Sequence, residues 1–240
     1  MTYLDASKLD YRTINEALRQ LREPCIITGC CGQRFLGTGM SQQNITIHGT
    51  PGNALGAYLN GASITVYGNG QDAVGDTMND GSIVIHGSIG DATGYAMRGG
   101  SIFVKGSAGY RAGIHMKAYK EKVPLMVIGG IAGSFLGEYQ AGGVILVLGL
   151  NAGGRRIVSN FPCTGMHGGK MILRSDCQDI RFPSQVTARP ASADDLIEIR
   201  TYVSQFSRLF GMDADAIMGA PFTVVTPDSS NPYHQMYVAN

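Results

Sequence analysis

Histidine has the widest range of chemistry in this sequence, because imidazole can bind metals and transfer protons near neutral pH. His48 and His86 are separated by two steps of a 19-residue repeat. Positions two turns apart in a stacked repeat lie roughly 9–10 Å apart, whereas the ligands of one zinc ion lie at ~2.1 Å from it. His115 and His167 fall at other positions of the repeat. We therefore predict surface histidines and no metal site, with a ligand or acid–base role as the alternative.

Sulfur-containing side chains are the next candidates. The cysteines are Cys25, Cys30, Cys31, Cys163 and Cys177, and no two of them form a C-x-x-C pair. This spacing matches neither zinc nor iron–sulfur sites and predicts free, mostly buried thiols in a reducing compartment. Redox activity at Cys30 and Cys31 is the alternative. Residues Met40, Leu59, Met78, Met97 and Met116 recur at the 19-residue step and predict a core column rather than a copper site.

Polar and glycine-rich segments suggest two further kinds of site. Asn53, Asp72 and Asp91 recur at the same step; stacked carboxylates can bind calcium, but beside glycine we predict Asx turns. The glycine-rich string at 68–75 is not followed by a helix, so it does not predict a phosphate loop. The segment 151–169, with its two arginines, departs from the repeat, and we predict a partner contact or a bulge there, with a binding loop as the alternative. No catalytic, cofactor-binding or metal-binding residue is therefore predicted.

All these residues belong to one repeat. The strings ITIHG at 45–49, ITVYG at 64–68, IVIHG at 83–87 and IFVKG at 102–106 follow one another at a step of 19 residues, and weaker copies extend the series in both directions. Alternating β-branched residues bounded by glycine predict short strands, and the unit is too short for a strand–helix–strand motif. The predicted structural glycines, at corners with positive φ or close backbone approach, are Gly49, Gly56, Gly68, Gly75, Gly87, Gly94, Gly106, Gly113 and Gly137.

The repeat predicts an all-β fold, a single-stranded parallel β-helix whose coils of about 19 residues stack at ~4.8 Å. Two inward columns are expected, one beginning at Ile45 and the other at Ile47. By alternation, the column that begins at His48 and includes Tyr67, His86 and Lys105 points outward.

Three regions are predicted: an N-terminal capping helix in 1–24, the β-helix domain in 25–175, and a linker, a helix and an extended tail in 176–240. Thr13 and Glu16 predict a capping box for a helix over about 13–22. Ser192 and Asp195 predict the start of a second helix, which ends at Gly211. Its expected apolar face contains Leu196, Ile199, Tyr202 or Val203, Phe206 and Leu209. Because open solenoid ends expose strand edges, we expect a helix to cap each end. The tail is apolar enough, at Phe222, Val224, Tyr233 and Tyr237, to dock on its own solenoid or on a partner.

The glycine pairs, and the stretch GDTMNDGSIVIHGSIGDATGYAMRGGSIFVKG at 75–106, resemble the GXGXG domain family over about residues 25–175. This resemblance implies a right-handed β-helix. The family includes the C-terminal domain of the glutamate synthase alpha subunit, the β-helix subunit of formylmethanofuran dehydrogenase, and stand-alone subunits of glutamate synthase and of N-methylglutamate synthase-like amidotransferases. The helices and the tail from Pro221 are most similar to the stand-alone glutamate synthase subunit.

The resemblance implies a non-catalytic scaffold that holds a glutaminase part and a synthase part together. FMN and the iron–sulfur cluster are expected in partner subunits, and no cofactor is expected in this chain. Thr2 stands where the glutaminase nucleophile, an N-terminal cysteine, would be expected. The alternatives are the β-helix subunit of one of the other complexes, or a self-contained solenoid enzyme.

The amino-acid composition limits the classes of partner that are expected for this chain. The net charge is +1 and charged residues make up only 15% of the chain, so neither nucleic acid nor a membrane surface is an expected partner. No apolar run approaches 18 residues, and the opening MTYLDASKLD does not resemble a signal peptide. These features predict a cytoplasmic protein. Assembly of several copies of this chain is left open.

Overall fold

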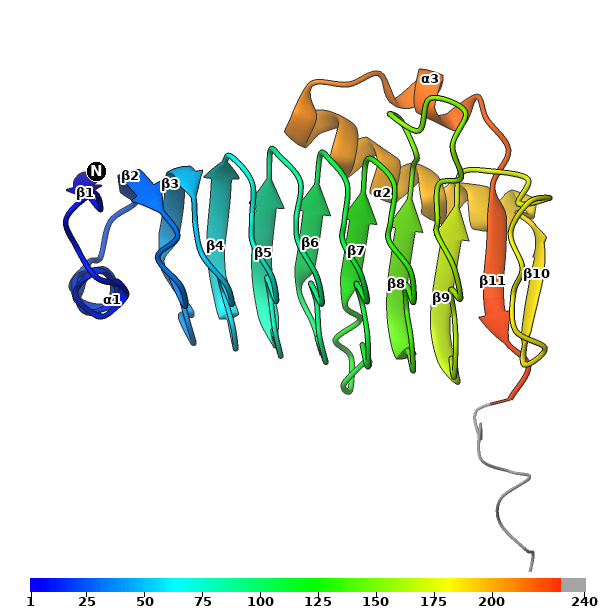
Figure 1. The fold of residues 1–240 in the computed structure, drawn as a ribbon, viewed down its shortest axis with the longest axis horizontal. Helices are drawn as coiled ribbons and strands as arrows, with labels where there is room; N and C mark the ends of the chain where they lie inside the picture. The colour runs from blue at the N-terminus through cyan, green and yellow to red at the C-terminus, as the bar shows by residue number, and fades with distance from the viewer. Residues whose placement is uncertain (230–240) are drawn as a thin grey trace, which may run out of the picture.

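The computed structural model describes residues 1–229, whose strands form a single sheet (Figure 1). The strands lie side by side in the order β1 to β9, followed by β11 and then β10. Their bounds are β1 Thr2–Asp5, β2 Cys25–Cys31, β3 Asn44–Thr50, β4 Asn60–Tyr67, β5 Asp80–Ile85, β6 Ser101–Val104, β7 Leu125–Ile128, β8 Ala141–Val147, β9 Gly168–Leu173, β10 Val186–Pro190 and β11 Thr223–Pro227. The helices are α1 Tyr11–Gln20, α2 Ala193–Phe210 and α3 Ala214–Met218.

Successive strands from β1 to β9 pair in parallel. Ile45 lies opposite Ile64, and Ile64 lies opposite Ile83. This column continues through Ile102, Met126, Ile145 and Met171, and each of its side chains is at most 1% exposed. The chain thus winds a β-solenoid of about eight turns around an apolar core. The predicted all-β parallel solenoid is confirmed.

The methionine column is also inside the solenoid, since Met40, Leu59, Met78, Met97 and Met116 are at most 3% exposed. Backbone hydrogen bonds extend it through Gln140, whose N–H donates to Gly137 just as that of Met116 donates to Gly113. The Gln140 amide nitrogen donates to the carbonyls of Gly142 and Gly143, at 3.2 and 3.1 Å, while its carbonyl oxygen has no partner. A polar side chain therefore interrupts an otherwise apolar column.

Each coil contains a turn in which three alternate residues have positive φ. In one coil these residues are Ala54, Gly56 and Tyr58, with φ of 61°, 63° and 57°. The N–H of Ala54 donates to Asp72 in the next coil, that of Gly56 to Leu36 in the preceding coil, and that of Tyr58 to Asp76 in the next coil. Residues other than glycine pay roughly 1–2 kcal/mol for this conformation, and hydrogen bonds to both neighbouring coils offset that cost. Further non-glycine residues at the two outer positions are Phe35, Ala73, Thr77, Ala92, Ala96, Arg111, His115, Phe135, Tyr139 and Phe161.

The repeated glycines have two geometries. Gly56, Gly75, Gly94, Gly113 and Gly137 occupy the central position of the turn, with φ between 63° and 69°. Gly68, Gly87 and Gly106 follow strands, and Gly49 lies near the end of β3 with φ of 129°. A Cβ at any of these four positions would lie 2.1 to 2.3 Å from an oxygen atom of the preceding coil. The first group needs an unusual backbone conformation, and the second group leaves room for the adjacent coil.

The N-terminal segment forms an edge strand as well as the expected helix, because β1 pairs with β2. Helix α1 begins after Asp10, whose carboxylate accepts a hydrogen bond from the Thr13 N–H at 2.8 Å. The prediction that Thr13 and Glu16 form a capping box at the start of this helix was therefore wrong. Asp10 has an extended backbone and lies three residues before Thr13, so its carboxylate satisfies one of the free N–H groups in the first turn of the helix.

Asn15 of α1 completes the first coil. In later coils the central glycine donates its N–H to the preceding coil, but Gly37 lies in the first turn of this type. Its N–H instead donates to Asn15 Oδ1 at 2.9 Å, and Asn15 Nδ2 donates to the Phe35 carbonyl at 2.9 Å. Ile14 and Leu18, both fully buried, pack on the core beside it. The helix thus supplies the hydrogen bonds of a missing coil.

Helix α2 begins as predicted. Ser192 and Asp195 form a capping box, and Gly211 ends the helix with φ of 66°. Of its expected face, Ile199, Val203 and Phe206 are buried, whereas Leu196 and Leu209 are 38% and 37% exposed.

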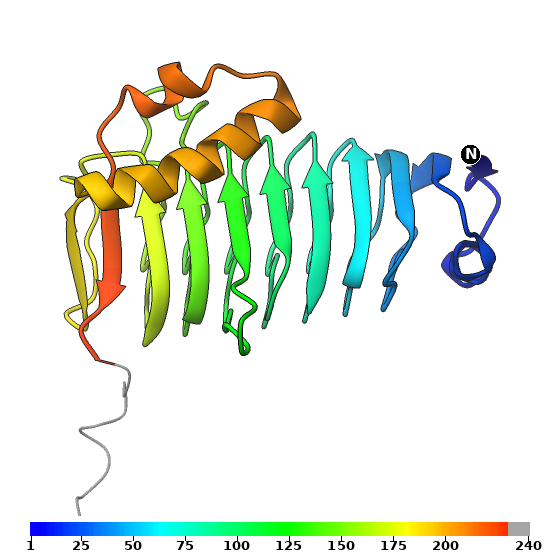
Figure 2. The same cartoon turned by 180° about the vertical axis from the view of Figure 1, so that it is seen from behind.

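The position of α2 differs from the prediction. It lies along the outer face of the sheet rather than over its end (Figure 2). Ile199, Val203 and Phe206 pack against the outward side chains Val84, Phe103, Val127, Leu146 and Ile172. The physical reason is that these outward positions are apolar in the second half of the sheet and need a cover, whereas Thr46 and Thr65 occupy them in the first half.

The end of the solenoid is closed by strands. β11 pairs antiparallel with β9, and β10 pairs with β11. Phe222 and Val224 are buried, so this part of the tail docks on its own solenoid. Tyr233 and Tyr237 lie outside the described residues.

Candidate functional site

The outward histidine column forms a stack of rings. Ring centroids are 5.1 Å apart between His48 and Tyr67 and 4.3 Å apart between Tyr67 and His86. Phe210 of α2 meets His86 edge-on at 5.2 Å. Partial burial, together with the nearby Lys105, lowers the pKa of His86. Because a tyrosine ring separates the two imidazoles, this column is a packing surface rather than a set of metal ligands.

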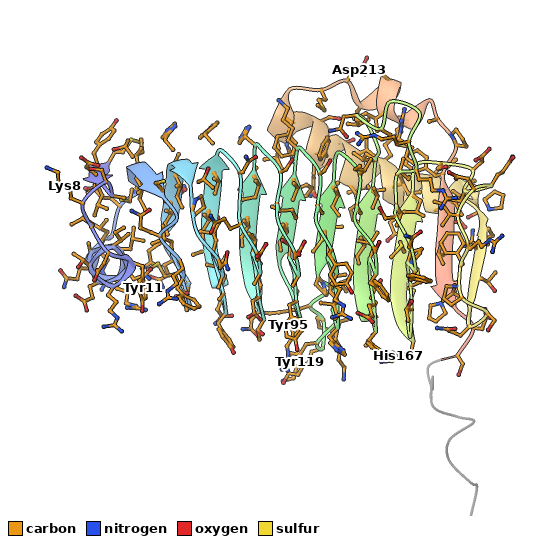
Figure 3. All side chains as sticks on the ribbon, in the orientation of Figure 1. Lys8, Tyr11, Tyr95, Tyr119, His167 and Asp213 are labelled. Carbon is orange, nitrogen blue, oxygen red and sulfur yellow. The ribbon has the colours of Figure 1, made fainter. Side chains whose placement is uncertain are left out.

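Two other histidines lie on the side of the molecule formed by the turns, where Figure 3 labels His167. The His115 ring stacks on Tyr139 at 5.2 Å and meets Tyr95 edge-on at 5.9 Å. His167 Nδ1 lies 3.0 Å from the Gly165 carbonyl. The structure therefore does not bring these side chains together with His48 and His86.

The cysteines are free thiols. Cys30 is buried and its neighbour Cys31 is exposed. Burial raises the pKa of Cys30 to about 11 and also raises the pKa of Cys163. Reactive thiols need the opposite shift, because the thiolate is the nucleophile. Cys163 occupies the central glycine position of the last such turn, with φ of 60°, and its Sγ lies 3.4 Å from Met171 Sδ.

The Asn53, Asp72 and Asp91 column makes contacts between coils, so the predicted Asx turns were wrong. Asn53 Oδ1 accepts from the Asp72 N–H at 3.2 Å, Asp72 Oδ1 from the Asp91 N–H at 2.9 Å, and Asp91 Oδ1 from the Tyr110 N–H at 2.8 Å. Stacking at ~4.8 Å brings the backbone of the next coil within reach of each side chain. These side chains stabilise the stack and leave no converging carboxylates.

The irregular segment is shorter than predicted. Val158 pairs with Ala132, and the N–H groups of Phe135 and Cys163 bond the neighbouring turns in the usual way. Residues 157–166 thus follow the coil although their sequence lacks the glycine pattern, because Cys163 adopts the glycine conformation. The bulge itself holds Arg155, which donates to the Ala152 carbonyl, and Arg156, which pairs with Asp179 at 3.4 Å.

Within residues 1–229, no group of three or more His, Cys, Asp or Glu side chains has an arrangement that could hold a metal ion. In the same part of the chain, every helix is too short or too polar to cross a membrane.

The turns form an exposed aromatic surface that the repeat analysis did not identify. Tyr110, Phe135 and Phe161 follow one another with ring centroids 5.4 and 5.1 Å apart. The guanidinium of Arg111 lies 4.9 Å from the Tyr110 ring and its Nε lies 2.8 Å from the buried Glu138 carboxylate. We call this surface the turn edge; it comprises Tyr58, Tyr95, Tyr110, Arg111, His115, Phe135, Tyr139 and Phe161. Alignment of the turns coil by coil was the signal that could have found it.

The turn edge has the composition of a protein-binding surface. Tyr58, Tyr95 and Phe161 are 56%, 41% and 61% exposed. Tyrosine, phenylalanine and arginine are enriched where proteins bind one another. The rings are also supported by a rigid ladder of coils, so they lose little freedom on binding. The turn edge is therefore the candidate functional site.

Comparison with known proteins agrees with this architecture. The signature of the family described as "GXGXG motif" matches residues 10–226. The chain is also 39% identical, over 248 aligned residues, to the uncharacterized protein MJ1350 of Methanocaldococcus jannaschii, covering 98% of this chain and 95% of that protein. The family match spans nearly the whole solenoid together with α1 and α2. The chain belongs to the GXGXG motif family.

Proposed function

We propose that this chain is a non-catalytic structural subunit of a glutamate synthase-type complex. Its solenoid would hold a glutaminase subunit and a synthase subunit, which carries FMN and an iron–sulfur cluster, at a fixed separation. Ammonia released by the first subunit would then reach the second without escaping. Membership of the GXGXG motif family, which relates the chain to a domain of glutamate synthase, supports this proposal.

The observation that carries the proposal is the turn edge. It presents exposed aromatic rings and Arg111 along several consecutive coils. Each coil bonds both of its neighbours through the backbone, so the surface keeps its shape when a partner binds. An extended rigid surface with exposed aromatic anchors suits the binding of large partners better than it suits catalysis on a small molecule.

Purification of the tagged full-length chain from its native host at low salt tests the proposal. We expect a glutaminase and an FMN- and iron–sulfur-containing synthase to co-elute in fixed ratio, and glutamine-dependent glutamate formation by the complex to require this chain. Elution of the chain alone would contradict the proposal. Co-elution with a formylmethanofuran dehydrogenase or an N-methylglutamate synthase would show that the chain serves that complex instead of a glutamate synthase.

Paired variants test the role of the turn edge. Tyr95→Ala/Phe161→Ala should reduce affinity for the partners at least tenfold, because exposed aromatic anchors contribute strongly to binding. Tyr3→Ala/Ile197→Ala removes two side chains that are each 70% exposed elsewhere and should leave affinity unchanged. Equal effects of both pairs would argue against the turn edge as the binding surface.

A further inference from the structure

One coil is longer than its neighbours and forms a hairpin beside the turn edge. Hydrogen-bonded residues of adjacent coils are 24 residues apart here, as for Ile131 and Ser107, but 19 apart for Ser107 and Ser88. The additional residues form a tight turn in which Tyr119 and Lys122 each donate an N–H to the other's carbonyl at 3.0 Å. Figure 3 places Tyr119 on the same lower side of the molecule as Tyr95.

The hairpin folds against the preceding coils. Lys122 Nζ lies 2.7 Å from Asp80 Oδ2, and a Cβ on Gly99 would meet the Lys122 side chain at 3.0 Å. Gly99 follows Arg98, so Lys122 is held next to Arg98. The N–H of Arg98 donates to Met78, and the N–H of Lys117 donates to Met97. Arg98 and Lys117 therefore occupy equivalent positions in consecutive coils, with backbones ~4.8 Å apart.

These contacts create a local excess of positive charge. Arg98, Lys117 and Lys120 are exposed, and no carboxylate of residues 1–229 lies within ion-pair distance of them. Asp80 pairs with Lys122, and Glu121 lies between Lys120 and Lys122 in the chain. Like charges stacked on adjacent coils repel one another, and the chain as a whole carries a net charge of only +1. The local excess of positive charge would attract an anionic partner.

Apolar side chains are exposed among the cations. Tyr119 is 53% exposed and Val123 is 57% exposed. We define the basic patch as Arg98, Lys117, Tyr119, Lys120, Lys122 and Val123. An inorganic anion or a nucleic acid backbone would use the cations but not Val123. An acidic polypeptide with apolar residues would use both parts of the patch.

We propose that the basic patch binds an acidic segment of a partner protein. Carboxylates of that segment pair with Arg98, Lys117 and Lys120, while an apolar side chain packs on Tyr119 and Val123. The inference rests on the proposed function in that the partner is a subunit of the same complex. The turn edge would supply aromatic contacts, and the basic patch would determine the charge of the surface that binds beside it.

The first test uses a probe that does not depend on the identity of the complex. A fluorescein-labelled peptide of eight glutamates with a central leucine is titrated with the full-length chain at low salt, and anisotropy is measured. We expect Lys117→Glu/Lys120→Glu to weaken binding at least tenfold while its far-UV circular dichroism stays unchanged. Lys8→Glu/Arg22→Glu makes the same change in net charge at the N-terminal end and should retain wild-type affinity. The inference would be overturned if the wild-type chain did not bind the peptide, or if both variants lost affinity equally. It would also be overturned if a single-stranded oligonucleotide bound the wild-type chain more tightly than the peptide does and Lys117→Glu/Lys120→Glu abolished that binding.

The second test separates this inference from the proposed function. The same variants are mixed with the separately produced glutaminase and synthase subunits. If the wild-type chain assembles with the subunits and Lys117→Glu/Lys120→Glu weakens this assembly at least tenfold, both proposals are supported. If the variant assembles as well as the wild-type chain, the inference is overturned and the proposed function is kept. Failure of wild type to assemble, together with charge-dependent peptide binding, overturns the proposed function and keeps the basic patch.

Discussion

Glycine in this solenoid prevents two different clashes. Gly75 has φ of 67°, and a Cβ there would lie 2.5 Å from Ile102 Cδ1. Gly68 has no positive φ, but a Cβ there would lie 2.1 Å from the Gly49 carbonyl oxygen. A terminal methyl group can shift by rotation, whereas a backbone carbonyl in a stacked coil cannot. The same residue type is therefore required at these two positions for different physical reasons.

Alanine at three glycines separates these effects. Gly32→Ala introduces only backbone strain, since φ is 80° and no atom lies within 4 Å of the new Cβ, and should cost about 1–2 kcal/mol. Gly75→Ala adds a clash in the core, and Gly68→Ala forces two coils apart, so each should cost at least about 1 kcal/mol more. Urea unfolding of the three variants measures the order. A Gly32 variant as unstable as the other two would contradict the assignment of steric causes.

His86 predicts a pH dependence of stability. Its pKa in the folded state is lowered, mainly by desolvation, so the unfolded chain binds its proton more tightly. The contribution of His86 to stability is therefore full above its unfolded pKa of about 6.5 and is lost as the pH falls below that value. Denaturant midpoints measured between pH 7.5 and 5 should fall less steeply in His86→Gln than in wild type. Identical slopes would show that His86 titrates alike in both states.

At the scale of elements, the helices complete or cover the sheet in different ways. α1 supplies side-chain hydrogen bonds to the first coil through Asn15. α2 covers the apolar outer face of the later strands. Both helices were predicted from caps and apolar periodicity, which depend on neighbouring residues in the chain. Their positions were not predictable in this way, because they depend on which distant backbone or side-chain groups lack a partner.

Asn15 provides a test of the cap. Asn15→Leu replaces the buried amide with an apolar side chain of similar size but leaves the Gly37 N–H and the Phe35 carbonyl without these hydrogen bonds. We expect a loss of about 1–3 kcal/mol in the free energy of unfolding. Glu16→Leu changes the next, exposed residue of the same helix and should change stability by no more than ~0.5 kcal/mol. Equal effects in the two variants would mean that the Asn15 hydrogen bonds do not stabilise the cap.

At the scale of the whole molecule, the solenoid adds one coil per repeat, and each coil contacts only its neighbours. Stability then depends on contacts between adjacent coils, and length depends on their number. In the proposed function, the number of coils sets the distance between bound partners. Within the turn edge, Tyr58 and Tyr95 lie in coils two repeats apart, so the spacing along this surface is a direct consequence of repeat number.

Duplication of one coil tests this relation. A second copy of residues 45–63 inserted after residue 63 adds a full repeat before β5, outside the strands whose outer side chains α2 covers. The chain should still fold cooperatively, and small-angle scattering should show a maximum dimension about 4.8 Å longer. If the chain holds two partners at a fixed separation, glutamine-dependent activity of the complex should fall at least tenfold while each partner still binds singly. Unchanged activity would indicate that the separation is not functional.

The amino-acid sequence alone determined the repeat, the positions of the strands within it, the parallel stacking and the inward columns, because a 19-residue period places like residues above one another without reference to distant groups. It also determined the capping box at Ser192, which depends on residues three apart in the chain. Strands β1 and β10 were not predicted, and β10 lies in the segment expected to be a linker. The sequence also supported the resemblance to the GXGXG domain family. Only the tertiary structure decided that Asp10 caps α1, that α2 lies on the outer face, that Cys163 adopts a glycine conformation and that Asn53, Asp72 and Asp91 bond the next coil. It also decided where exposed aromatic rings and unpaired cations gather. These outcomes depend on distances between residues far apart in the chain, and such distances arise only after the coils have stacked.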